Sequence, residues 1–227
     1  MPGRIASFAI AASTALVLLG ASILPFLTPA YLHVEQQRAG AERFTGYDGV
    51  TLDGVTTAIV HDLLLGGDFG TAVHGTPVLN EREQGHMRDV RGVFQGFFAL
   101  AAAGLIVLAW AFRRARAPEA RAATWRAVGS GARGLAIVLV VAGVLAVCAF
   151  DAAFEVFHRL FFSAGSYTFD PRTDRLVQLF PEQFWSETAI AVGIVAIVAA
   201  LLTAWVAARR ARSATPAAVL TTSRVRP

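Results

Sequence analysis

Four stretches of the chain contain no charged residue and no histidine, and each approaches the length of a membrane-crossing helix. They are residues 5–32, 92–112, 134–150 and 188–208. A helix needs about 20 apolar residues to cross a bilayer core about 30 Å thick. A helix on the surface of a soluble protein would show a polar stripe at helical spacing, and none of these stretches has one. The pattern therefore predicts an all-α, polytopic membrane protein with four transmembrane helices.

The charged residues between these stretches predict how the chain is oriented. All 20 basic residues are arginine, and 12 of them lie at the N-terminus, in the loop 113–133 or in the tail 209–227, with one acidic residue. The segments 33–91 and 151–187 hold eight arginines, 15 acidic residues and all five histidines. Because arginine-rich loops stay in the cytoplasm, we expect both termini inside. The two acidic segments are then expected to form a small extracytoplasmic cap on a single membrane domain, residues 1–227.

The composition also indicates a membrane protein, and it excludes several classes of function. With 55% hydrophobic and 16% charged residues, the chain is too apolar for a water-soluble domain. Its formal charge of +4 and pI near 10.2 come from the arginines of the inner segments, so we expect no nucleic-acid partner. The single cysteine, Cys148, lies within the third apolar stretch. A disulfide scaffold and a thiol oxidoreductase that uses cysteine pairs are therefore excluded.

The first acidic segment contains one further predicted helix. Leu52, Val55, Ile59 and Leu63 recur at helical spacing, and the run stops at Gly66. We expect this helix on the outer surface, with its apolar face against lipid or against the transmembrane helices. Three histidines of the same segment are interpreted as solvated or interfacial: His33, His61 and His74.

The residues that lead into the second apolar block form the first candidate functional group. Asn80 followed by Glu83 is typical of a capping box that begins a helix. On such a helix Glu83 and His86 share one face, and Asp89 lies beside His86. At 1.5 Å per residue, His86 stands about 9 Å before the apolar block, at the depth of lipid headgroups and glycerol esters. A solvated charged face near the membrane surface is the open alternative.

A second group follows the third apolar block. Asp151, Glu155 and His158 are spaced to form one stripe along the outward end of that span. Several phenylalanines surround the stripe: Phe150, Phe154, Phe157, Phe161 and Phe162. Ionisable residues so close to hydrocarbon normally face a bundle interior or a wet cavity. The two Glu-x-x-His patterns, Glu83/His86 and Glu155/His158, are therefore predicted to point toward one pocket at the membrane surface.

These residues lie in a pattern that resembles the bacterial lipoprotein intramolecular transacylases, Lit, which are small membrane proteins with four spans. The span count and loop sizes match over essentially the whole chain. The matching motifs precede the second span, follow the third and precede the fourth: Glu83-x-x-His86-x-x-Asp89-Val90; Phe157-His158 with Phe161-Phe162; and Phe169-Asp170-Pro171, Asp174 and Leu179-Phe180-Pro181-Glu182.

The resemblance implies an acyltransferase of the bacterial cytoplasmic membrane with an extracytoplasmic active site. It would move the sn-2 acyl chain of a diacylglyceryl lipoprotein to the α-amino group of that lipoprotein's N-terminal cysteine. Its partners would be this lipoprotein substrate and the lipid of the membrane. The chemistry needs a base for the amine and donors for the oxyanion, which suits a pair of histidines and needs no cofactor or metal. The expected catalytic residues are His86, His158, Glu83, Asp89 and Glu155. The expected substrate-binding residues are Phe157, Phe161, Tyr167, Phe169 and Asp170.

Two other interpretations stay open at this point. Paired Glu-x-x-His motifs on neighbouring helices are also typical of carboxylate-bridged dinuclear metal sites, although the first and fourth apolar stretches offer no further carboxylate. A membrane scaffold or lipid-sensing protein, whose acids and histidines only solvate its surface, would show the same composition.

Overall fold

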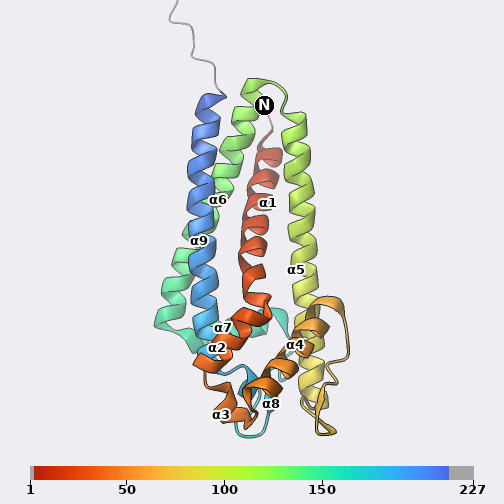
Figure 1. The fold of residues 1–227 in the computed structure, drawn as a ribbon. Coiled ribbons are helices and arrows are strands. Elements are labelled where there is room, and N and C mark those ends of the chain that lie inside the picture. The colour runs from red at the N-terminus through yellow and green to blue at the C-terminus, as the bar shows by residue number, and fades with distance from the viewer. Residues whose placement is uncertain (1–2, 215–227) are drawn as a thin grey trace, which may run out of the picture.

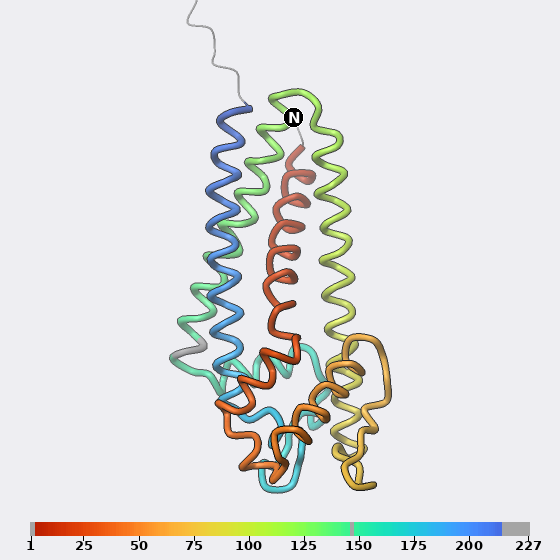
Figure 2. Tube along the Cα trace, in the orientation of Figure 1, coloured from red at the N-terminus to blue at the C-terminus, as the bar shows by residue number. Residues whose placement is uncertain are grey.

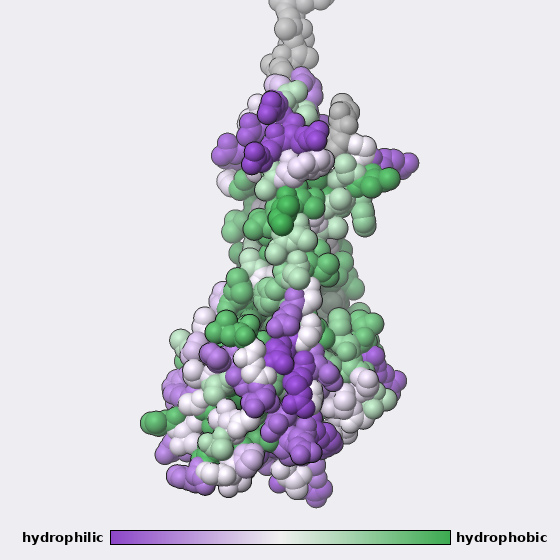
Figure 3. All heavy atoms as spheres, turned by 90° about the vertical axis from the view of Figure 1, so that its right-hand side faces the viewer, coloured by the Kyte–Doolittle hydropathy of each residue, from purple (hydrophilic) through white to green (hydrophobic). Residues whose placement is uncertain are grey.

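Four long helices run side by side along the molecule in the computed structural model, which describes residues 3–214 (Figure 1). They are α1 (Arg4–Ile23), α5 (Glu81–Arg114), α6 (Pro118–Cys148) and α9 (Glu182–Ser213). Each is long and apolar enough to cross a membrane. On the face shown in Figure 3, apolar residues form a band between polar residues at both ends. The predicted all-α membrane protein with four spans is confirmed.

Small residues let these helices pack closely. Five alanines lie buried along one face of α9: Ala196, Ala200, Ala204, Ala207 and Ala211. Without a hydrophobic driving force in lipid, such small residues permit the close approach that makes van der Waals packing favourable. Gly131 of α6 is the tightest point, because a Cβ there would stand 2.1 Å from the carbonyl oxygen of Ala11 on α1. Any side chain at this position would push the two helices apart.

The first apolar stretch, predicted as one span over 5–32, is divided in the structure. Helix α1 ends at Ile23, a 3-10 turn (η1) covers Leu24–Leu27, and α2 covers Pro29–Arg38. The prolines at 25 and 29 explain the division, since proline lacks the N–H of a helical hydrogen bond and clashes with the preceding turn. Thr28 caps the new helix by accepting a hydrogen bond from the N–H of Tyr31.

The third apolar stretch also ends earlier than predicted. Helix α6 stops at Cys148, Ala149 takes a non-helical conformation, and α7 (Phe150–Phe161) turns aside across the end of the bundle (Figure 2). The residues 151–158 therefore lie on a separate helix and not on an extension of the span. Five large apolar side chains of α7 are exposed: Phe154, Val156, Phe157, Leu160 and Phe161. A helix with one exposed apolar face is typical of the membrane interface.

A cap covers the end of the bundle opposite the N-terminus (Figure 1). It consists of α2, α3 (Ala41–Thr45), α4 (Gly49–Leu65), a hairpin of β1 (Ala72–Val73) and β2 (Thr76–Pro77), α8 (Arg175–Leu179) and the first turns of α5. The two strands are antiparallel, with Ala72 opposite Pro77. The apolar face predicted on α4 packs into the core of this cap, where it meets Leu79, Leu179 and Phe184. That face is therefore shielded from lipid by the cap itself.

Of the predicted inner tail, 209–227, the part before residue 214 continues α9. Residues 215–227, with Arg224 and Arg226, lie outside the described part of the chain.

Candidate active site

The start of α5 is fixed by a capping box that also joins it to α8. The side chain of Asn80 accepts a hydrogen bond from the N–H of Glu83 (3.0 Å), and Glu83 Oε2 accepts one from the N–H of Asn80 (2.7 Å). The other carboxylate oxygen of Glu83 accepts the N–H of Leu176 (2.7 Å), and the side chain is 1% exposed. Both oxygens of Glu83 are thus engaged by backbone, one turn before His86.

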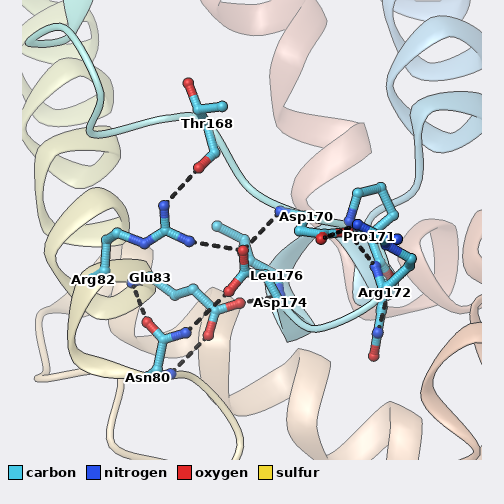
Figure 4. A network of polar contacts seen from close by, with 10 residues as sticks. Asn80, Arg82, Glu83, Thr168, Asp170, Pro171, Arg172, Asp174 and Leu176 are labelled. Atoms are coloured by element: carbon cyan, nitrogen blue, oxygen red, sulfur yellow. Dashed lines mark hydrogen bonds and ion pairs between the residues drawn. The ribbon is translucent and has the colours of Figure 1, made fainter.

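Asp174 ties the loop before α8 to the same end of α5 (Figure 4). Its carboxylate, on a residue only 6% exposed, accepts hydrogen bonds from Asn80 Nδ2 (3.2 Å), from Arg82 Nη2 (2.7 Å) and from the N–H of Asp170 (2.7 Å). Arg82 also donates to the carbonyl of Thr168 (2.7 Å). This network holds the segment 168–174 against the helix that carries His86.

The two histidines of the Glu-x-x-His patterns come together between α5 and α7. Their ring centroids lie 6.1 Å apart with 22° between the ring planes, and the residues are 7% and 9% exposed. Aromatic rings surround both. His86 contacts Phe162 (4.8 Å between centroids) and Phe169 (5.4 Å). The rings around His158 are Phe154 (4.0 Å), Tyr167 (5.0 Å), Phe157 (5.4 Å) and Phe162 (5.4 Å).

One hydrogen bond orients His158. Its Nδ1 lies 2.8 Å from the carbonyl oxygen of Phe154, one turn earlier on α7. A carbonyl only accepts hydrogen bonds, so Nδ1 carries the proton and donates it. In the neutral ring the lone pair is therefore on Nε2, where the ring can act as a base.

His86 is buried and differs from His158 in its hydrogen bonding. We take the charge-free block 92–112 as the membrane-spanning part of α5, and His86 precedes it. Its buried Nδ1 has no hydrogen-bond partner among the described residues. Burial and the neighbouring His158 lower the pKa of the His86 imidazole to about 4, although the charge of Asp89 acts in the opposite direction. The ring is therefore neutral at neutral pH.

The predicted acidic partners lie around the pair without orienting either ring by a hydrogen bond. Asp89 is exposed on α5. Glu155 accepts hydrogen bonds from Arg159 Nε (2.7 Å) and from the hydroxyl of Tyr167 (3.2 Å). The hydrogen bond from Arg159, followed by that from Tyr167, holds the pKa of the Glu155 carboxyl below its usual value. Glu155 thereby positions Tyr167, whose ring in turn packs on His158.

The structure separates the predicted substrate-binding residues into two groups. Tyr167, Phe169 and Phe157 pack directly on the histidines. Phe161 contacts the ring of Phe157 and is exposed, whereas Asp170 bonds to Arg172 through its carboxylate. These hydrogen bonds from Arg172 lower the pKa of the Asp170 carboxyl.

Two residues of the site were not predicted as functional. The ring of Phe162 touches both histidines, and the Arg82 guanidinium lies 4.8 Å above the ring of Phe169. Phe162 is part of the motif around His158, and Arg82 directly precedes Glu83. Their ring contacts depend on the tertiary structure, so the sequence did not predict them.

The geometry does not favour the dinuclear metal site. Within the described residues, no three His, Cys, Asp or Glu side chains gather where they could hold one metal ion. The carboxylates of both Glu-x-x-His patterns are also engaged elsewhere, Glu83 by backbone N–H groups and Glu155 by Arg159.

The fold and this site define a membrane-integral helical bundle with a histidine pair enclosed by aromatic rings at its capped end. The family described as lipoprotein intramolecular transacylase, Lit, matches residues 8–185. The chain belongs to this family of membrane acyltransferases, as the motifs around the two histidines predicted.

Solved structures of a relative share the fold. The membrane-integral lipoprotein intramolecular transacylase Lit from Bacillus cereus is 14% identical, with a TM-score of 0.72 over 92% of this chain and 96% of that chain. A variant of it with one histidine changed to arginine gives a TM-score of 0.71 at 14% identity, over 92% of each chain. A histidine-to-alanine variant gives 0.66 at 15% identity, over 92% of this chain and 94% of that chain. A comparison with curated proteins found no match.

Proposed function

We propose that this chain moves the sn-2 acyl chain of a diacylglyceryl lipoprotein to the α-amino group of that lipoprotein's N-terminal cysteine. The amine nitrogen attacks the ester carbonyl carbon, a C–N bond forms, and the C–O bond to glycerol breaks. One proton leaves the amine and one reaches the departing glycerol oxygen. Because the substrate supplies its own nucleophile, the protein needs only a base, an oxyanion donor and a binding site.

His158 is the base in this proposal. The hydrogen bond from its Nδ1 to the Phe154 carbonyl leaves the Nε2 lone pair available for the amine proton. The imidazolium that forms keeps this bond and lies among the rings of Phe154 and Tyr167, whose faces attract a cation. The same proton then passes to the glycerol oxygen, so that His158 ends the reaction neutral.

His86 is the oxyanion donor. A buried N–H without a partner is costly, which favours the tautomer with a bare Nδ1 and the proton on Nε2. Its low pKa keeps His86 neutral while its neighbour is protonated, so two positive charges never face each other in the stacked pair. A neutral imidazole N–H can then donate to the negative oxygen of the tetrahedral intermediate.

The surroundings support an ester substrate that stays in the membrane. The exposed apolar side chains of α7 suit a helix that lies in the interface, where the glycerol esters of a lipid are found. Phe157 and Phe161 would contact the acyl chains, while Tyr167 and Phe169 close the site against water. The arginine distribution supports an extracytoplasmic position of the capped end. Glu83 and Glu155 are then positioning residues, Asp170 is a substrate-binding residue, and Asp89 acts through its charge.

The stacked pair of buried histidines is the observation that carries this proposal. The test is mass spectrometry of a lipoprotein co-expressed with the wild type, with His158→Gln or with His86→Gln. Glutamine retains an N–H donor but no base. We therefore expect His158→Gln to lose acyl transfer by about 10²–10⁴-fold and His86→Gln to retain at least tenfold more activity than His158→Gln. The reverse order would exchange the two roles. A lipoprotein whose acyl chain stays on glycerol with the wild type would instead support a scaffold or lipid-sensing protein.

A further inference from the structure

A second hollow lies at the other end of the bundle, between α6 and α9. It has a volume of about 280 Å³ and is lined by residues of both helices, among them Trp125, Gly129 and Ala211. Figure 1 shows that the start of α6 and the end of α9 lie at the end where α1 begins, far from the cap. Nothing in the proposed acyl transfer uses this hollow.

Three arginines surround it. Arg126 and Arg133 stand two turns apart on the same side of α6, and Arg212 faces them from α9. Their side chains are exposed, whereas Gly129 and Ala211 beneath them are buried. A guanidinium nitrogen of Arg133 comes within 3.3 Å of where a Cβ on Gly129 would stand, so this side chain reaches over the floor of the hollow. The small residues of the floor thus leave space that the three arginines enclose.

None of these three charges forms an ion pair among the residues that the structure describes. The ion pairs of the described residues involve other arginines, and none of them reaches Arg126, Arg133 or Arg212. Nearby arginines instead lie on aromatic rings: Arg114 is 5.0 Å from the ring centroid of Trp110, and Arg209 is 4.2 Å from that of Trp205. Unpaired guanidinium groups around a hollow suit a phosphate, which they can bind through paired N–H donors.

The position of the hollow along the helices indicates that this phosphate belongs to a lipid headgroup. The charge-free block of α6 begins at residue 134, directly after Arg133, and that of α9 ends at residue 208, just before the arginines of its last turns. The hollow therefore lies where the apolar band meets the polar end, at the level of lipid headgroups. Basic pockets between transmembrane helices at this depth are typical sites for anionic lipids. We infer that this hollow binds the phosphate-bearing headgroup of an anionic phospholipid.

The test compares two variants of the full-length protein that lose the same charge. The first variant removes the arginines of the hollow: Arg126→Gln/Arg133→Gln/Arg212→Gln. The second variant is the control and removes three other arginines from the same end of the bundle: Arg114→Gln/Arg121→Gln/Arg209→Gln. Each protein is placed in detergent with equal amounts of phosphatidylglycerol and phosphatidylcholine, and native mass spectrometry counts the bound lipids. We expect the first variant to lose about tenfold in bound phosphatidylglycerol and the second less than twofold.

Equal losses in the two variants would show attraction to general charge and would overturn the inference, as would no loss in either. Displacement of the lipid by inorganic phosphate alone, at millimolar concentration, would make the hollow a site for free phosphate and would also overturn it. If the first triple variant does not fold, Arg133→Gln against Arg209→Gln repeats the comparison with single changes, with an expected difference of about threefold.

Discussion

The ring of His86 lies nearly parallel to the ring of His158, with 6.1 Å between their centroids, although α5 carries one and α7 the other. Neither helix could build this pair alone. The start of α5 is anchored by Asn80 and Glu83, while α7 reaches the site because the chain turns aside at Ala149.

The two histidines should behave as one unit. His86→Ala and His158→Ala should each lower acyl transfer by about 10²–10⁴-fold, and the double variant should be within about tenfold of the worse single variant, because cooperating groups lose their effect together. Mass spectrometry of the lipoprotein product measures this. His61→Ala, at an exposed position on α4, is the control and should stay active. Losses that multiply in the double variant would mean that the two rings act independently.

Acid should destabilise the fold through His86. Its pKa is about 4 in the folded protein, below the ordinary 6.5, so the unfolded chain takes up this proton first as the pH falls. The stability that depends on a neutral His86 is present above about pH 6.5 and is lost progressively toward pH 4, by about 1–2 kcal/mol between pH 7 and pH 5. Thermal unfolding at both pH values should show that His86→Gln loses less stability between pH 7 and pH 5 than the wild type. An equal loss in the two proteins would contradict the low pKa.

Glu83→Gln should affect the stability of the fold more than the chemical step of acyl transfer. Its two carboxylate oxygens accept the N–H groups of Asn80 and Leu176, and an amide nitrogen would face one of these donors. We expect a loss of about 1–3 kcal/mol in the free energy of unfolding. Glu81→Gln, an exposed change on the same turn, should leave the melting temperature unchanged. Inactive Glu83→Gln protein with a normal melting temperature would instead assign Glu83 to the acid–base chemistry.

Replacing either of two aspartates in one loop should have very different effects on stability. Asp174→Asn removes a buried carboxylate that holds Asn80, Arg82 and the backbone of Asp170, so we expect a loss of about 1–3 kcal/mol and weaker activity as Phe169 loosens from His86. Asp170→Asn breaks only contacts with exposed Arg172 and should leave the melting temperature unchanged. Thermal unfolding and product analysis measure both. A larger effect of Asp170→Asn on activity at unchanged stability would support its role in substrate binding.

Orientation in the membrane can be tested by labelling. In a Cys148→Ser background, a cysteine in place of Thr76 on the cap hairpin should react with an impermeant maleimide in intact cells. A cysteine in place of Ser213, at the end of α9, should react only after the cells are opened. Labelling of the Ser213 position in intact cells would reverse the proposed topology.

The sequence by itself determined the membrane class, the number of spans and the start of α5. Long charge-free stretches are sufficient for the first two, because the bilayer imposes one minimum length on every spanning helix. The capping box at Asn80 was also readable, since both partners lie within one turn of the chain. The two Glu-x-x-His patterns indicated which two histidines lie in one site, but not what their neighbours contact.

Only the tertiary structure decided the contacts of the residues around the pair. Glu83 bonds to Leu176, Asp174 to Arg82, and Glu155 to Tyr167, so acids that looked alike along the chain have different partners in space. The break at Ala149 is likewise absent from the hydropathy pattern, whereas the break after Ile23 follows from the prolines at 25 and 29. Contacts between distant segments depend on packing and backbone direction, which the spacing of residues along one helix does not contain. For that reason the pattern predicted a shared pocket for the two histidines, and only the fold showed that their rings stack.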